Sequence, residues 1–412
     1  MATGLADIIE ALLGTDLPVA FETYDGSRTG PEQADATIVI RSPDAIRRIV
    51  TAPGELGFGR AYVAGDLDLR GDVYAALALR DRMPEVKVSP SVWLRLLRYA
   101  GVSSLRPLPP PPEEARLRGR RHSPERDAAA VSHHYDVSNA FYGMVLGPSM
   151  TYSCAVFEQP DAPLEDAQAA KYDLICRKLG LEPGMRLLDI GCGWGGMVVH
   201  AARHYGVRAV GITLARRQVE WAEKAIADAG LSGQVEVRLQ DYRTIDDGPF
   251  DAVSSIGMFE HVGVEKAGEY FSTISRLLRP RGRLLNHAIS RPPYRRARFA
   301  RAGFIERYVF PDGELLEVGE TTSAVQKAGF EARHMESLRE HYARTLRHWV
   351  ANLEANWDAA VAEAGDARAR IWRLYMAASA INFESNRTQI HQILAVRTED
   401  GDSGLPLRLH WT

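Results

Sequence analysis

The chain is poor in cysteine, and the pattern of the few it has excludes two common roles. Cys154, Cys176 and Cys192 are the only three in 412 residues, and their spacing matches neither a disulfide framework nor a zinc site. A reducing compartment such as the cytosol fits this composition best. The sequence also lacks a run of roughly 18 apolar residues, so no membrane-spanning helix is predicted.

An excess of charge of one sign is also missing. The 50 basic and 53 acidic side chains leave a net charge of −3, which gives no general attraction to nucleic acid. The first residues, MATGLADIIEALLGTD, contain acids and no basic stretch, so a secretory signal peptide is not predicted. We therefore expect a cytoplasmic protein without a nucleic-acid partner, which would meet the cell membrane only from its inner face.

A proline- and arginine-rich stretch divides the chain. Residues 104–127, SLRPLPPPPEEARLRGRRHSPERD, contain four consecutive prolines, which hold the backbone extended and stiff. The charged residues that follow have little to bury. We interpret this stretch as a linker between a smaller N-terminal domain, residues 1–103, and a catalytic domain, residues 128–412.

The N-terminal domain has mixed α+β signals and no catalytic constellation. ATIVIRS at 36–42 predicts a strand, and SVWLRLLRYAG at 91–101 predicts an amphipathic helix. Arg95 and Arg98 share one side of that helix, so it suits an anionic membrane surface. Packing of the same helix on its own domain is the simpler explanation of the pattern.

The C-terminal part alternates strand and helix signals at regular spacing. Strands are predicted at 185–191, 207–213, 234–240, 249–257 and 281–289, and helices at 196–206, 216–230 and 265–280. Such alternation predicts an α/β fold, with a mostly parallel sheet and helices on both faces.

Glycines and polar residues gather where three of these strands end. LLDIGCGWGG places Gly191, Gly193 and Gly195 between a strand and a helix, where backbone can approach a ligand closely. The other polar strand-end residues are Asp189, Thr213, Gln218, Asp241 and Tyr242. Because ligands of open α/β sheets bind across the carboxyl ends of strands, these residues predict one nucleoside-shaped groove.

This groove resembles that of class I (Rossmann-like) S-adenosylmethionine (SAM) methyltransferases. By that resemblance the glycine loop would lie against the methionine part of SAM, and Asp241 and Tyr242 would hold the adenine. The second strand ends in Thr213, where the class usually has an acid. Helix capping by Asp189 and core packing of Tyr242 are the simpler structural alternatives.

Motifs outside the glycine loop indicate one family within this class. VSHHYDVSNAFYGMVLGPSMTYSCAVFE at 131–158, GMFEHVG, LLNHAI and HYARTLRHW accompany the glycine loop. Together they resemble the cyclopropane fatty acid synthase-type methyltransferases over most of 131–412. The N-terminal domain resembles the accessory domain of the longer, phospholipid-acting members, which implies a lipid-docking role.

The resemblance implies a reaction and a set of residues. A cis-unsaturated acyl chain of a phospholipid would attack the methyl group of SAM, and a bound bicarbonate would deprotonate the resulting carbocation to give a cyclopropane. Glu260, His287 and Tyr342 would hold the bicarbonate with side chains, and Cys154 and Ile289 with backbone atoms. Tyr152 and Ser153 would face SAM. A thiol nucleophile at Cys154 is the weaker alternative, because alkene methylation needs none.

General chemistry is consistent with that assignment. A carbocation must be shielded from water, and aromatic faces stabilise cations. The matched segments supply such rings in Tyr135, Phe141, Tyr142, Tyr152, Phe259 and Tyr342. His261 is more simply interpreted as a structural histidine at a helix start.

Two segments depart from the family pattern. FPDGELLEVGE at 310–320 lacks the usual Pro-Ser, and YMAASAINFESNRTQIHQIL at 375–394 differs from the commoner family endings. Some family members do not close the ring but leave a mid-chain methylene branch, which a partner reductase converts to a methyl branch. That product stays open as the main alternative. The resemblance is also compatible with a homodimer.

An arginine-rich stretch includes the first of these departures. Residues 290–320 contain, among aromatic residues, Arg291, Arg295, Arg296, Arg298, Arg301 and Arg307. Such a patch could hold lipid phosphates at a bilayer surface, or it could be a solvated loop.

Three other classes of protein would explain part of the sequence but not all of it. A SAM methyltransferase for a small polar acceptor explains the glycine loop but not Glu260, His287 and Tyr342 together. A non-catalytic lipid carrier would have no need of intact cofactor motifs. A nicotinamide oxidoreductase would need a ribose-binding acid at the second strand end, where Thr213 stands.

Overall fold

Two packing units that are discontinuous in sequence make up the protein. The computed structural model describes residues 4–82, 106–115, 137–293 and 303–410, with positions 99, 119, 121, 123, 126 and 127 between them. The first unit comprises residues 1–116, 299–309 and 356–381, and the second comprises the rest. The proline-rich stretch predicted two consecutive domains, whereas packing groups residues 356–381 with the N-terminal residues.

The first unit is built on a small mixed sheet of order β2-β1-β3-β4. Its strands are β1 (Ala20–Thr23), β2 (Arg28–Thr29), β3 (Ala36–Ile40) and β4 (Leu67–Gly71). Its helices are α1 (Leu5–Leu13), α2 (Pro43–Thr51), α3 (Glu55–Val63), α4 (Val73–Arg82), α12 (Phe304–Tyr308), α15 (Trp357–Ala364) and most of α16 (Asp366–Glu384). The strand expected at 36–42 is β3. Its residues after Ala36 are all β-branched and are mostly buried. The amphipathic helix expected at 91–101 lies outside the described residues apart from Tyr99.

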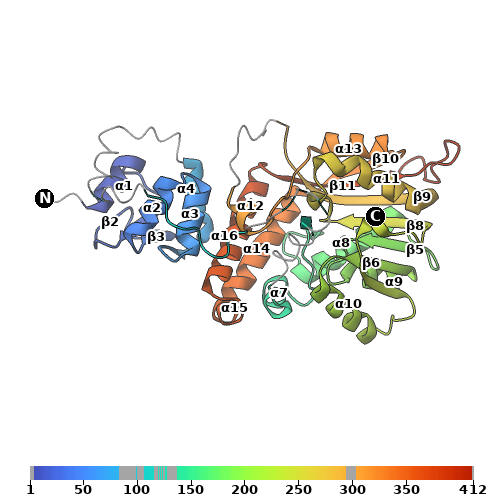
Figure 1. The fold of residues 1–412 in the computed structure, drawn as a ribbon, viewed down its shortest axis with the longest axis horizontal. Helices are drawn as coiled ribbons and strands as arrows, with labels where there is room; N and C mark the ends of the chain where they lie inside the picture. The colour runs from blue at the N-terminus through green and yellow to red at the C-terminus, as the bar shows by residue number, and fades with distance from the viewer. Residues whose placement is uncertain are drawn as a thin grey trace. The chain divides into compact units, whose positions relative to one another are not determined.

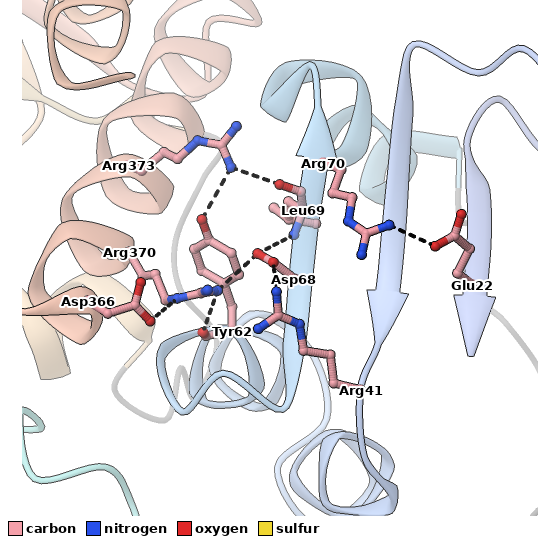
Figure 2. A network of polar contacts seen from close by, with 9 residues as sticks. All are labelled: Glu22, Arg41, Tyr62, Asp68, Leu69, Arg70, Asp366, Arg370 and Arg373. Carbon is pink, nitrogen blue, oxygen red and sulfur yellow. Dashed lines mark hydrogen bonds and ion pairs between the residues drawn. The ribbon is translucent and has the colours of Figure 1, made fainter. Parts of the chain in front are cut away.

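Buried arginines of α16 hold that helix to β4 and α3 (Figure 2). The Arg370 guanidinium donates to Asp68 at 3.0 Å and to Asp366 at 2.6 Å. Arg373 donates to the Tyr62 hydroxyl and to the Leu69 carbonyl, each at 3.2 Å. Because a buried guanidinium needs several acceptors, these bonds explain why a segment distant in sequence belongs to this unit.

The second unit contains a seven-stranded sheet of order β10-β11-β9-β8-β5-β6-β7 (Figure 1). Its strands are β5 (Arg186–Ile190), β6 (Arg208–Thr213), β7 (Val235–Leu239), β8 (Phe250–Ile256), β9 (Leu278–Ser290), β10 (Glu331–Ser337) and β11 (Gln389–Val396). The five strands β5 to β9 pair in parallel, and β11 lies antiparallel between β9 and β10. The predicted mostly parallel α/β sheet is confirmed.

Helices cover both faces of this sheet. They are α7 (Asn139–Leu146), α8 (Leu164–Leu179), α9 (Gly196–Tyr205), α10 (Arg216–Asp228), α11 (Ala267–Leu277), α13 (Val318–Lys327) and α14 (Arg339–Ala355). Leu187 packs with α8, α9 and α10, whereas its neighbour Leu188 packs with α11 on the other face. Strands buried on both sides explain the nearly continuous apolar runs in the sequence. The expected helix 265–280 is shorter, because Leu278 begins β9 instead.

Three short 3-10 helices follow strand ends near the pocket: η2 (Tyr242–Thr244), η3 (Phe259–His261) and η4 (Val264–Lys266). Within the described residues, no helix is long and apolar enough to cross a membrane.

Candidate active site

A pocket opens at the carboxyl ends of the parallel strands of the second unit. It contains nine of the ten residues expected to bind the cofactor: Tyr152, Ser153, Asp189, Gly191, Gly193, Thr213, Gln218, Asp241 and Tyr242. Gly195 is not among its lining residues and instead precedes α9 as its N-terminal cap, with φ of 86°. Strand order brings these residues together, since β5, β6 and β7 are neighbours and β8 borders β5.

The glycine loop has the backbone form that its sequence predicts. Gly191 and Gly193 have φ of 81° and 54°, which side chains with a Cβ rarely adopt. A Cβ on Gly191 would lie 2.9 Å from the Met258 Cβ, so this loop also needs the space that glycine leaves. The loop therefore presents bare backbone to the pocket.

Asp189 is buried below this loop and does not cap a helix. Its carboxylate accepts a hydrogen bond of 2.6 Å from the Ser254 hydroxyl on β8. Burial raises the pKa of Asp189 to about 6, while the Ser254 hydroxyl and the charge of Lys171 oppose that rise. Asp189 thus joins two parallel strands at the floor of the pocket.

The other strand ends carry organised polar pairs. The Thr213 hydroxyl donates to Gln218 Oε1 at 2.6 Å, so the two residues act as a unit at the end of β6. Asp241 accepts from the Arg243 guanidinium at 2.6 Å and from the Arg243 backbone N–H at 2.9 Å. Tyr242 is buried edge-on against Tyr270, with ring centroids 4.9 Å apart. These contacts hold the polar side chains of the groove walls to one another.

Lys171, a buried lysine that lines the pocket, was not identified from the sequence. The Lys171 side chain is fully buried, and its Nζ lies 2.9 Å from the Ser153 hydroxyl and 3.7 Å from the Tyr172 ring centroid. Burial lowers the pKa of Lys171 to about 7. A signal was present, because Lys171, Leu174, Ile175 and Lys178 have the spacing of one buried helix face, where lysine is unusual.

Glu260 lies in η3, directly after β8. Its Oε1 accepts a hydrogen bond of 2.7 Å from the Ile289 backbone N–H, whereas its buried Oε2 has no hydrogen-bond partner in the described parts of the chain. Burial raises the pKa of Glu260 to about 7, and the Ile289 bond partly offsets this. The backbone N–H of Ile289 therefore donates to Glu260.

His287 lies two residues before Ile289 on β9 and is fully buried. Its Nδ1 is 3.2 Å from Gln392 Nε2, and its Nε2 has no partner among the residues that the structure describes. Burial, with the nearby charges of Lys171 and Lys178, lowers the pKa of His287. The ring is therefore neutral at physiological pH.

Cys154 and Tyr342 meet at one carbonyl. The Cys154 thiol lies 3.6 Å from the Leu338 oxygen, and the Tyr342 backbone N–H donates to the same oxygen at 3.1 Å. Burial raises the pKa of the Cys154 thiol well above its usual range, so the reactive thiolate is disfavoured. This environment is inconsistent with a thiol nucleophile.

Aromatic rings connect the pocket to Tyr342. Tyr152 in the pocket lies 5.3 Å from Trp349 between ring centroids, and Trp349 lies 6.0 Å from Tyr342 in an edge-to-face contact. Phe310 stacks on Tyr152 at 6.5 Å and contacts the pocket residue His261 at 5.8 Å. The aromatic Tyr135 lies outside the described residues.

The arginine-rich stretch is only partly described. Arg291 donates to Glu317 at 2.7 Å, and Arg307 donates to Glu114 at 2.7 Å. These two cations are therefore bound within the protein, whereas the other four arginines lie outside the described residues.

Comparison with known proteins identifies the class. The chain matches the mycolic acid cyclopropane synthetase family over residues 122–393. It is 49% identical to a probable fatty acid methyltransferase of Mycobacterium tuberculosis, across 100% of both chains. It is 39% identical to a probable fatty acid methyltransferase of Pseudomonas putida, across 99% of this chain and 98% of the relative.

Comparison with solved structures gives the same class of protein. The mycolic acid cyclopropane synthase CmaA1, complexed with SAH and CTAB, superposes with a TM-score of 0.62 at 35% identity, over 65% of this chain and 98% of that one. Pocket, fold and similarity define a SAM-dependent methyltransferase. The chain belongs to the mycolic acid cyclopropane synthetase family.

Proposed function

We propose that the enzyme transfers a methyl group from SAM to the cis double bond of an unsaturated fatty acyl chain within a phospholipid, and that loss of a proton then closes a cyclopropane ring. Its relatives of similar length are called probable fatty acid methyltransferases. The solved relative is called a mycolic acid cyclopropane synthase. Both names support an acyl acceptor over a small polar one.

The observation that carries the proposal is a pair of buried polar atoms that have no hydrogen-bond partner among the described residues. The two atoms are Glu260 Oε2 and His287 Nε2. The Glu260 carboxylate is bonded to the Ile289 N–H, and His287 lies two residues before Ile289 on the same strand. Unpaired buried polar atoms are costly, so such a pair indicates a missing polar ligand. A carboxylate and a neutral imidazole together suit bicarbonate, which has both an O–H donor and negatively charged acceptor oxygens.

When bound there, bicarbonate would supply the base that removes a proton from the added methyl group. Glu260 would accept its O–H, and His287 would donate to one of its oxygens. Tyr342 would contribute from α14, with Cys154 positioned on the same Leu338 carbonyl. No side chain of the protein then has to act as the base.

The remaining residues shield and stabilise positive charge. The rings of Tyr152, Trp349 and Tyr342 form a contiguous path from the pocket, and ring faces attract cations. Exclusion of water by such a wall would protect a carbocation from being trapped. We expect the acyl chain to reach this wall from the membrane, with the enzyme bound peripherally to lipid.

A second product is favoured by specific contacts. Both segments that depart from the family pattern contact residues of the proposed bicarbonate site. In the first, the Glu314 N–H donates to the Glu260 carbonyl at 3.0 Å. In the second, the Phe383 ring centroid lies 4.7 Å from that of Tyr342. Small shifts of base or chain decide how the cation is resolved. A 1,2-hydride shift along the chain would move the cation onto the methylated carbon, and loss of a proton from the added methyl group would then give a methylene branch, the substrate for a partner reductase.

The test is incubation of the purified enzyme with SAM and oleoyl phospholipid vesicles, followed by mass spectrometry with double-bond cleavage. Cyclopropane and methylene products gain the same mass, so cleavage separates them. A gain that resists cleavage supports ring closure, and a cleavable product supports the methylene branch. No gain in mass would overturn the acyl acceptor and favour a small polar one.

A further inference from the structure

A row of polar residues crosses the sheet and ends at His287. In the strand register, Glu336 of β10 lies opposite Gln392 of β11, and Gln392 lies opposite His287 of β9. Cross-strand partners project to the same face, so these three side chains stand side by side. Lys178 of α8 reaches this row from the covering layer, where it is fully buried.

The contacts along the row are continuous. Lys178 Nζ forms an ion pair with Glu336, and it lies 2.7 Å from Gln392 Oε1. Gln392 Nε2 lies 3.2 Å from His287 Nδ1. Burial lowers the pKa of Lys178, and the Glu336 carboxylate opposes that effect and favours its charged form.

The donors and acceptors of this row permit one arrangement. A lysine ammonium has three donors and no acceptor, so the Gln392 oxygen must face Lys178. The amide nitrogen of Gln392 then faces His287, and an amide NH₂ only donates. His287 Nδ1 must therefore accept, and the single proton of the neutral ring must be on Nε2.

We propose that Lys178 and Gln392 are positioning residues, which hold His287 in the tautomer that carries its proton on Nε2. Nε2 is the buried ring atom that has no partner in the described structure. In this tautomer the imidazole offers an N–H to an anion, whereas the opposite tautomer would turn a lone pair toward it. This inference rests on the proposed bicarbonate site for its consequence in catalysis, but the tautomer itself follows from the Lys178–Gln392–His287 contacts.

The pairing with Lys178 explains why glutamine is suited to position 392. An apolar residue would leave both Lys178 and His287 Nδ1 without this partner in the interior. A residue that accepts from Nδ1 would favour the wrong tautomer. Metal-ligating histidines are oriented in the same way through their second ring nitrogen, and loss of that partner typically costs about ten- to a hundredfold in metal affinity or activity.

The decisive measurement is the ring nitrogen spectrum of His287 in the full-length enzyme labelled with ¹⁵N-histidine. The His287 signals are identified by their loss in His287→Gln. We expect wild type to show a protonated Nε2 and an unprotonated Nδ1. A protonated Nδ1 in the neutral wild-type ring would overturn the inference without any variant.

Variants then separate positioning from simple stability. Gln392→Leu should populate both tautomers and lower turnover on oleoyl phospholipid vesicles about ten- to a hundredfold, with SAM affinity unchanged. Lys178→Met frees the amide to turn and should shift the ring toward a protonated Nδ1. Lys178→Arg retains a donor-only cation and should keep the wild-type tautomer.

A matched control is available on the same strand. Gln389 of β11 bonds to Asn386 at 2.8 Å, away from His287. Gln389→Leu should leave both the His287 spectrum and turnover as in wild type. An unchanged spectrum and unchanged turnover in Gln392→Leu would overturn the positioning role.

Failure of the bicarbonate proposal gives a different result. Turnover of wild type that does not fall when bicarbonate is removed from the buffer would contradict that proposal. The His287 spectra would still report whether Lys178 and Gln392 set the tautomer.

Discussion

The carboxylate of Glu260 is bound on one side only: Oε1 accepts the Ile289 N–H at 2.7 Å, while Oε2 is buried without a partner among the described residues. A carboxylate held in this way is oriented but incompletely satisfied. In an interior this state is costly, and it is typical of a site that awaits a ligand. Glu260 therefore gives the most direct tests of the proposed chemistry.

Glu260→Gln should abolish most turnover while SAM still binds. Glutamine preserves the shape of the side chain but removes the anionic acceptor that bicarbonate would need. We expect turnover on vesicles to fall at least about a hundredfold, with the dissociation constant of SAM unchanged by calorimetry. Turnover close to that of wild type would remove Glu260 from the mechanism.

The same substitution should stabilise the protein at high pH. Burial raises the pKa of Glu260 from its ordinary value of 4.5 to about 7, so between these values the folded protein binds a proton that the unfolded chain does not. Stability of wild type therefore falls as pH rises through this window. Glutamine does not titrate.

We expect Glu260→Gln to gain at most about 3 kcal/mol over wild type above pH 7, and nothing from this source below pH 4.5. Denaturant unfolding at pH 4 and pH 8, without ligands, measures the difference. A gain that is equal at both pH values would contradict the raised pKa.

Cys154→Ser should remain active. The thiol is fully buried and its pKa is raised, so its chemistry is not that of a nucleophile. Serine retains a side chain that can donate to the Ala155 or Leu338 carbonyl oxygen, which lie 3.2 and 3.6 Å from the sulfur. Turnover should stay within about threefold of wild type, since only weak hydrogen bonds of the side chain change. Complete loss in a folded variant would restore the thiol to the mechanism.

Lys171→Met should weaken SAM binding. Lys171 is the fully buried cation of the pocket wall beside Ser153, and SAM carries a carboxylate at its methionine end. Removal of one charged hydrogen-bond partner costs about 1.5–3 kcal/mol, or roughly ten- to a hundredfold in affinity. Calorimetric titration checks this, with the exposed Lys224→Met as the control. Equal affinities in both variants would exclude a cofactor role for Lys171.

Arg373→Met should destabilise the first unit. The Arg373 side chain is buried and donates to Tyr62 and to the Leu69 carbonyl (Figure 2). It also donates to the Gly71 carbonyl. Its loss should cost about 2–3 kcal/mol in the free energy of unfolding. The exposed Arg70–Glu22 pair provides the control, because Arg70→Ala should cost less than about 1 kcal/mol. Similar losses in both variants would refute the structural role of Arg373.

These contacts also bear on truncation. Removal of residues 1–103 would take away Asp68 and Tyr62, the partners of Arg370 and Arg373. Such a truncation therefore changes the folding of residues 356–381 as well as any lipid docking. Point substitutions on the N-terminal residues are the cleaner test of membrane binding.

Much of the catalytic fold was predictable because its signals are local. The run RLLDI and the glycines after it specify a buried strand and a loop with positive φ, and both features depend on neighbouring residues only. The strands β5 to β8 and the helices α9 and α10 follow in the same way. The sequence also indicated which strand ends face the pocket, because parallel strands end at one edge.

The position and partners of β10 and β11 could not be predicted in this way. Gln392 meets His287 only because β11 enters antiparallel between β9 and β10, 105 residues away along the chain. Lys171 and Lys178 lie on the buried face of α8, where they contact polar side chains of other segments. Periodicity identifies a face but not the polar groups that will pair with it.

The sequence by itself determined the alternation of strands and helices, the glycine loop and the family to which the chain belongs. Only the tertiary structure decided that Glu260 Oε2 and His287 Nε2 are buried with no partner in the described parts of the chain, that α16 packs with the N-terminal residues, and that Lys178 orients Gln392. The physical reason is that burial and hydrogen-bond pairing depend on segments distant in sequence, whereas backbone conformation and periodicity depend on near ones.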